Sequence, residues 1–158
     1  MKKLIIISFC LLFILTGCIK ENKMNQDDDK ERVYLTEKYY NKGNAIKVDE
    51  TELSKLTNET FVVFTYNDYC SFTIPCDTIF EEFMDKYNID FINIPFENFK
   101  NTSYYETVKF GPSILIIQNG KILAYLDANS DEDLAKYQDV NSFEKWMDNY
   151  IYFSKKQN

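Results

Sequence analysis

The chain has 158 residues and a mass of 18.8 kDa, which suits a single domain and excludes two full cores. Hydrophobic residues make up 45%, which excludes a disordered chain, and the net charge of −7 excludes nucleic-acid binding by a broad basic face. The chain contains no histidine, so Ser-His and Cys-His catalysis and histidine metal sites are also excluded. Chemistry would rest on carboxylates, Lys, Tyr, Ser, Thr or the four cysteines.

The N-terminus has the pattern of an export signal. Lys2 and Lys3 precede an almost unbroken apolar run from Leu4 to Leu15. As a helix this run would be about 18 Å long, whereas the hydrocarbon core of a bilayer is about 30 Å thick. The run is therefore too short for a comfortable membrane span, and it fits the hydrophobic region of a signal peptide covering residues 1–17.

The residues that end this region, Leu15-Thr16-Gly17-Cys18, resemble the lipobox of bacterial lipoproteins. The resemblance implies cleavage before Cys18, acyl chains such as palmitate on that cysteine, and a lipid-anchored location on the extracytoplasmic face of the bacterial cell membrane. Two or three acyl chains anchor a protein stably, whereas one alone is marginal. A secretory signal with a chance cysteine, or an uncleaved anchor, is the alternative.

The remaining chain is predicted to hold one domain at 45–153, between a polar tether that begins with lipidated Cys18 (18–44) and a polar tail (154–158). Once the signal is removed and Cys18 is acylated, Cys70 and Cys76 are the remaining thiols. In an oxidising compartment such a pair more often forms a disulfide than binds zinc. The predicted elements are, in chain order, a helix at 49–58, a strand at 61–66, a helix at 75–87, a strand at 89–94, a helix at 101–109, strands at 113–117 and 121–126, and a helix at 141–153.

The order of these elements predicts the fold class. The first strand, helix and second strand require a right-handed parallel crossover, and Asn119-Gly120 indicates a tight hairpin and therefore an antiparallel pair. A central mixed sheet of four strands with helices on both faces satisfies both conditions. The chain is therefore predicted to be an α/β protein.

Three segments resemble the thioredoxin family, of which the closing amphipathic helix at 141–153 is the least specific. Residues 61–64 followed by Tyr69-Cys70 resemble the strand that leads into its active-site loop. Residues 110–121 resemble its cis-proline strand and hairpin, in which a proline, a small hydroxyl residue and an apolar run lead to an Asn-Gly turn. The resemblance is closest to thioredoxin-like proteins of bacterial surfaces and of the bacteriocin-transport accessory type. It implies a thioredoxin-like fold, with a cis Gly111-Pro112 peptide facing the cysteine loop.

The cysteine spacing departs from that family, whose redox motif is Cys-x-x-Cys. Either Cys70 matches the family's first cysteine, with an insertion before Pro75, or Pro75-Cys76 matches the family's Pro-Cys and leaves Thr73 at the first-cysteine position. A continuous helix would separate the two cysteines by about 9 Å along its axis, too far for a disulfide. A bridge therefore requires residues 71–74 to loop out. A helix starting at Pro75 would place Cys76 in its first turn, where the helix dipole lowers the pKa of a thiol.

The resemblance implies a thiol–disulfide oxidoreductase that acts on thiols or disulfides of extracytoplasmic proteins or peptides. By analogy Cys70 is the nucleophile and Cys76 the resolving cysteine, whereas the dipole alone favours Cys76 as the more acidic thiol. Pro112 would hold the loop that pairs with substrate, and Gly111, which lacks a side chain, would leave the groove more open. The alternative is a non-catalytic binding or accessory module with a structural Cys70–Cys76 disulfide.

No cofactor, metal or nucleic-acid partner is expected, and the chain is expected to be a monomer. The acidic residues at 131–133 are interpreted as a solvated surface rather than a calcium site. The tyrosine pairs, such as Tyr104-Tyr105, are interpreted as core or half-buried residues rather than as a face that binds sugars or peptides.

Overall fold

The structure is a computed structural model, and it describes residues 31–67 and 75–157. The predicted signal peptide at 1–17, the predicted lipidation site Cys18 and the predicted nucleophile Cys70 lie outside these residues. Among the helices of the described part of the chain, none is both long and apolar enough to span a membrane.

The centre of the molecule is a mixed sheet, in the order β1-β3-β2-β4-β5. The strands are β1 (Ala45–Lys47), β2 (Thr60–Tyr66), β3 (Phe91–Pro95), β4 (Ser113–Gln118) and β5 (Lys121–Tyr125). Strand β3 is parallel to both β1 and β2, whereas β4 is antiparallel to β2 and to β5. The mixed α/β sheet is confirmed, but the sheet has five strands where four were expected.

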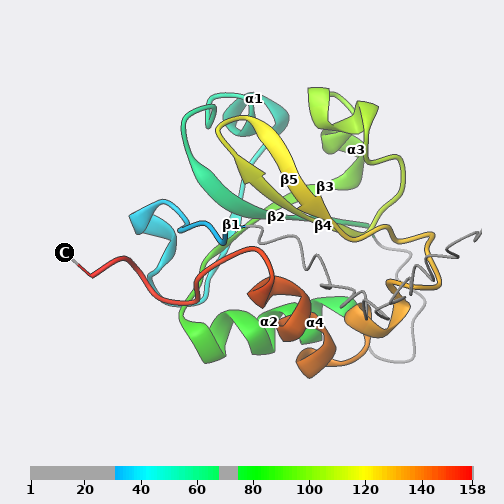
Figure 1. The fold of residues 1–158 in the computed structure, drawn as a ribbon. Coiled ribbons are helices and arrows are strands. Elements are labelled where there is room, and N and C mark those ends of the chain that lie inside the picture. Colours follow the sequence, from blue (N-terminus) through cyan, green and yellow to red (C-terminus); the bar gives the residue numbers. More distant parts are fainter. Residues whose placement is uncertain (1–30, 68–74, 158) are drawn as a thin grey trace, which may run out of the picture.

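Helices cover both faces of the sheet. Figure 1 shows α2 (Cys76–Tyr87) and α4 (Val140–Asp148) together below the sheet, and α1 (Glu50–Leu53) and α3 (Phe96–Phe99) above it. Three short 3-10 turns complete the elements, at Glu37–Tyr39, Ser103–Glu106 and Leu134–Tyr137. The core between the sheet and the lower helices is aromatic: Phe83 of α2 contacts the rings of Phe91 and Phe143 at centroid distances of 5.9 and 5.1 Å.

Side-chain caps explain where two of the helices begin. The Asp49 carboxylate accepts a hydrogen bond from the Glu52 backbone N–H at 2.8 Å, and the Glu52 side chain accepts one from the Asp49 N–H at 3.0 Å. This reciprocal capping box satisfies two N–H groups that an uncapped helix leaves without partners. Asp139 caps α4 by accepting from the Ser142 N–H at 2.7 Å.

The Asn119-Gly120 hairpin is confirmed, because both residues have positive φ angles, of 49° and 72°. The prediction of a helix at 101–109 is wrong. The chain forms α3 earlier, at Phe96–Phe99, because both of these aromatic side chains are buried there, and extended Thr102 then separates α3 from the 3-10 turn at Ser103–Glu106.

The last helix ends at Asp148, earlier than the predicted 153. The chain after it pairs with the N-terminal segment: the Val33 N–H donates to the Tyr150 carbonyl at 2.8 Å, and the Tyr152 N–H donates to the Val33 carbonyl at 3.0 Å. Leu35 and Tyr39 are buried in the core. Residues well before position 45, the expected start of the domain, thus already pack into its core.

Candidate functional site

A cleft of about 470 Å³ opens at the carboxyl ends of strands β2 and β3. Tyr66 and Asn67 line it at the end of β2, and Asn93 lines it from β3. Cys76, at the start of α2, and Pro112 also line the cleft. Ligand sites in α/β sheets collect at the carboxyl ends of strands, so the topology favours this cleft as the functional site.

Cys76 is the first residue of α2, and its exposed fraction is 2%. Pro75 stands just before the helix as its N-cap, with φ −55° and ψ 128°. Proline has a fixed φ and no N–H to donate, so it suits the position just before a helix that begins at the cysteine. The helix start and the position of Cys76 in the first turn agree with the sequence prediction. The positive end of the helix dipole at this point favours a negative charge.

The peptide bond between Gly111 and Pro112 is cis, as predicted. Two hydrogen bonds join this loop to the end of β2, and a third is made within the loop. The Asn67 side-chain amide donates to the Gly111 carbonyl at 2.8 Å, and the Ser113 hydroxyl donates to the Phe110 carbonyl at 2.7 Å. The Ser113 N–H donates to the Thr65 hydroxyl at 2.9 Å, inside the protein. These bonds hold the segment around Pro112 against the end of β2, and Pro112 lines the cleft together with Cys76.

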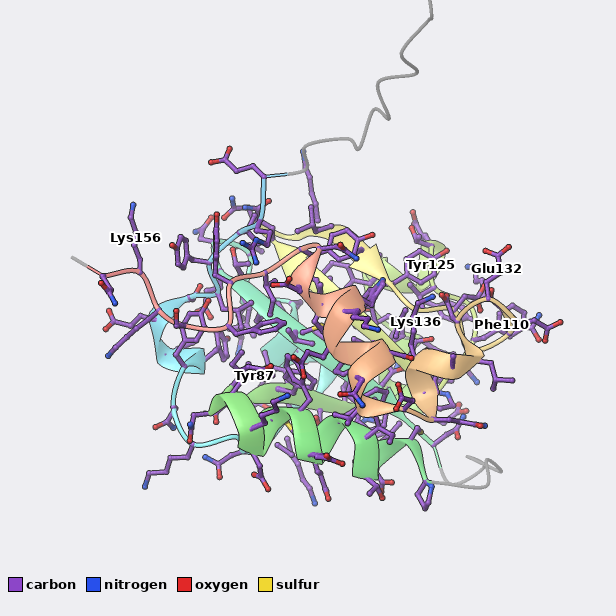
Figure 2. The ribbon with its side chains drawn as sticks, turned by 60° about the horizontal axis from the view of Figure 1, so that its bottom comes forward. Tyr87, Phe110, Tyr125, Glu132, Lys136 and Lys156 are labelled. Atoms are coloured by element: carbon purple, nitrogen blue, oxygen red, sulfur yellow. The ribbon has the colours of Figure 1, made fainter. Side chains whose placement is uncertain are left out.

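Gly111 does not leave the groove more open, which corrects the expectation from the sequence. A Cβ atom built on Gly111 would lie 2.5 Å from Cδ2 of Phe96, so the Phe96 ring already fills the space that a side chain would take. Phe110, one residue earlier, is 49% exposed. Figure 2 shows it at the same end of the molecule as Glu132 and far from Lys156.

Two residues of this region were not singled out from the sequence. Asn93 lines the cleft, and its buried Oδ1 accepts no hydrogen bond from the residues that the structure describes. Tyr137 is buried, its hydroxyl donates to the Leu126 carbonyl at 2.9 Å, and its ring meets that of Phe80, one turn after Cys76 in α2. Burial raises the pKa of Tyr137 far above its usual range, and the nearby Asp133 carboxylate raises it further.

Asn93 could have been found from the sequence, because it is a polar residue in an otherwise apolar strand. No signal existed for Tyr137, because its position depends on the loop between β5 and α4.

The structure brings two of the predicted site residues together and leaves two undescribed. Cys76 and Pro112 line the same cleft. Cys70 and Cys18 lie outside the described residues. Within 31–67 and 75–157, no group of three or more Cys, Asp or Glu side chains is arranged to hold a metal ion. The charged residues that line the cleft are Lys47, Asp77 and Glu81.

Comparison with known proteins identifies the fold. No protein-family model matches the chain, and no curated protein matches it in sequence. Among solved structures, a mutant thioredoxin from Halobacterium salinarum is 16% identical with a TM-score of 0.52, over 71% of this chain and 95% of that one. A thioredoxin from Schistosoma mansoni is 21% identical with a TM-score of 0.48, over 69% of this chain and 97% of that one. The likeness to the Halobacterium salinarum thioredoxin shows that the fold is thioredoxin-like.

Proposed function

We propose that this chain is a thiol–disulfide oxidoreductase that acts through Cys70 and Cys76 on extracytoplasmic proteins. The observation that carries the proposal is the placement of Cys76 at the N-terminus of α2, in one cleft with the cis Pro112. A helix N-terminus stabilises a thiolate, and the thiolate is the species that reacts with disulfides.

In the proposed reaction, the Cys70 thiolate attacks one sulfur of a substrate disulfide. A mixed disulfide forms, and the other substrate sulfur leaves as a thiolate that takes up a proton. The Cys76 thiol then loses its proton and attacks Cys70, which releases the second substrate thiol. The substrate is reduced by two electrons, and the Cys70–Cys76 pair is oxidised by two electrons.

The burial of Cys76 supports this division of roles. An attacking sulfur must reach a substrate disulfide, whereas a resolving sulfur needs to reach only its partner cysteine. The exposed fraction of Cys76 is 2%, which suits the resolving role. The segment around Pro112, held by Asn67 and Ser113, would form the wall of the cleft against which a substrate segment lies.

The test is reduction of insulin by dithiothreitol in the presence of the chain. We expect the wild-type chain to accelerate precipitation of insulin, and Cys70→Ser to abolish the acceleration. Cys76→Ser should also lose turnover but should accumulate a mixed disulfide on Cys70, visible by mass spectrometry. If the wild-type chain gives no acceleration, and reduction of the pair only lowers its melting temperature, the chain is instead a binding module with a structural disulfide.

We further propose that a lipid on Cys18 anchors the chain to the membrane. The chain enters the fold at the amino end of β2, where the Thr36 N–H donates to the Thr60 carbonyl at 2.8 Å. The cleft lies at the other end of the same strand, so an anchor at Cys18 would leave it accessible to exported proteins. Cys18→Ala should move the chain from the detergent phase to the aqueous phase in detergent partitioning. Unchanged partitioning would refute the anchor and leave the redox proposal untouched.

A further inference from the structure

A second hollow, of about 560 Å³, runs beside strand β5 at the opposite edge of the sheet from β1. Every residue from Gly120 to Tyr125 lines it. Successive side chains of a strand point to opposite faces, so a groove across one face would be lined by alternate residues only. Lining by consecutive residues indicates that the hollow follows the backbone edge of the strand.

The edge of β5 offers unpaired backbone groups to this hollow. Within the described part of the chain, β5 pairs with β4 alone. The Leu126 N–H donates inward to the Ile114 carbonyl at 2.9 Å, and backbone groups alternate in direction along a strand, so those of Tyr125 point outward. Gln118 and Lys121 flank the two-residue turn and face each other, which makes the next residue, Ile122, outward-pointing as well. A β-bulge lies between Ile122 and Ala124, so an added strand would pair with Ile122 on one side of the bulge and with Tyr125 on the other.

The walls of the hollow are aromatic and nearly uncharged. Tyr104 stands on one side of the strand edge, from the 3-10 turn at Ser103–Glu106, and Tyr150 stands on the other side, after α4. Among the residues that the structure describes, Lys121 is the only charged one that lines the hollow, in a chain whose net charge is −7. This local reversal of charge favours a partner with acidic side chains, and it disfavours a second copy of this acidic chain.

We propose that the edge of β5 binds an extended polypeptide segment with apolar and acidic side chains, which adds to the sheet as a further strand. Backbone hydrogen bonds to Ile122 and Tyr125 would supply affinity, and contact with the tyrosine rings and Lys121 would select the side chains. This site is separate from the cysteine cleft, because the two share no lining residue.

The experiment measures fluorescence anisotropy of labelled eight-residue peptides mixed with the full chain in detergent micelles. The probes are a peptide of alternating Val and Glu, its counterpart with Lys in place of Glu, and the Val/Glu peptide with its backbone amides N-methylated. We expect the Val/Glu peptide to bind, the Val/Lys peptide to bind about tenfold more weakly, and the N-methylated peptide not to bind. Lys121→Glu should reverse the order of the first two peptides.

Ile122→Pro removes one outward N–H, and an edge strand tolerates this change because no ladder bond is lost. It should weaken binding of the Val/Glu peptide at least about tenfold, while the control Ile122→Val leaves binding unchanged. Equal binding of the N-methylated peptide, or an unchanged peptide order in Lys121→Glu, would overturn the proposal even if Ile122→Pro fails to fold. A dimer of the wild-type chain that Ile122→Pro dissociates would assign the edge to a second copy and would also overturn it.

Discussion

The Phe96 ring packs against Gly111 beside the cleft and occupies the space that a side chain at position 111 would need. We predict that Gly111→Ala destabilises the chain by about 1–3 kcal/mol, because its Cβ would lie 2.5 Å from Phe96 Cδ2 and the ring would have to move. Urea unfolding measures the change. Phe96→Leu in the same chain should recover part of the loss, and a double-mutant cycle with no coupling between the two positions would contradict this packing.

Glu59 gives the fold a contribution to stability that depends on pH. Its carboxylate accepts a hydrogen bond from the Tyr39 hydroxyl at 2.6 Å, and Lys38 Nζ lies 2.7 Å from its Oε2. Burial raises the pKa of Glu59, but the hydrogen bonds from Lys38 and Tyr39 outweigh burial and hold the pKa below its ordinary value of 4.5. Burial and the Glu59 carboxylate together raise the pKa of Tyr39 far above its usual range.

A carboxyl group with a lowered pKa in the folded state stabilises the fold fully above its ordinary pKa, and this contribution is lost as the pH falls through the lower value. We therefore predict that Glu59→Gln is less stable than the wild type at neutral pH, and that the difference shrinks as the pH falls below 4.5. Urea unfolding across this range measures both chains. A difference that does not change with pH would show that the charge of Glu59 is not involved.

At the scale of elements, the edge strand β1 depends on one buried carboxylate. Asp90 is 2% exposed, and its Oδ1 accepts from the backbone N–H groups of Lys42 and Asn44 at 3.2 and 2.7 Å. Gly43 between them has φ +75°, and a Cβ there would lie 2.6 Å from the Met84 carbonyl oxygen. The turn before β1 is therefore built around Asp90 and a glycine.

We predict that Asp90→Ala costs about 1–3 kcal/mol, because it leaves two backbone N–H groups without acceptors. Asp90→Asn should cost less, since its amide oxygen can still accept from both. Hydrogen exchange should show faster exchange at residues 42–47 in the alanine variant, with β4 amides as the internal control. Uniformly faster exchange over the whole sheet would mean that Asp90 supports the core rather than this edge.

The sequence predicts those elements that carry their own local signal. The β-branched run of β2, the proline before α2 and the Asn119-Gly120 turn each determine local backbone angles, and these elements lie where they were expected. Strand β1 carries no such signal, because it is only three residues long, its residues are exposed, and its pairing with β3 depends on the distant Asp90.

The same distinction holds at the cleft. The position of Cys76 follows from Pro75 next to it in sequence, whereas the contact between Gly111 and Phe96 joins two segments that only the folded chain brings together. The start of the helix is therefore predictable from the sequence, whereas the packing of Phe96 against Gly111 is not.

At the scale of the whole molecule, the two ends of the described chain are fastened to each other. Val33 forms a parallel bridge with Ile151, the rings of Tyr34 and Tyr152 stack at 4.3 Å, and Arg32 pairs with Asp148. Leu35 is 4% exposed and carries this segment into the core. Residues 32–39 thus contribute to the hydrophobic core and join the C-terminal segment, although their composition resembles that of a linker.

This arrangement predicts where the chain cannot be shortened. Deletion of residues 31–40 should unfold the domain or lower its melting temperature strongly, because Leu35 and Tyr39 are lost from the core. Leu35→Ala alone should cost about 2–5 kcal/mol, since a buried leucine leaves a cavity. Tyr34→Ala, at a position 39% exposed, is the matched control and should cost clearly less. If the chain without residues 31–40 melts like the full chain, residues 33–40 act as a tether after all, because the fold then does not need their side chains.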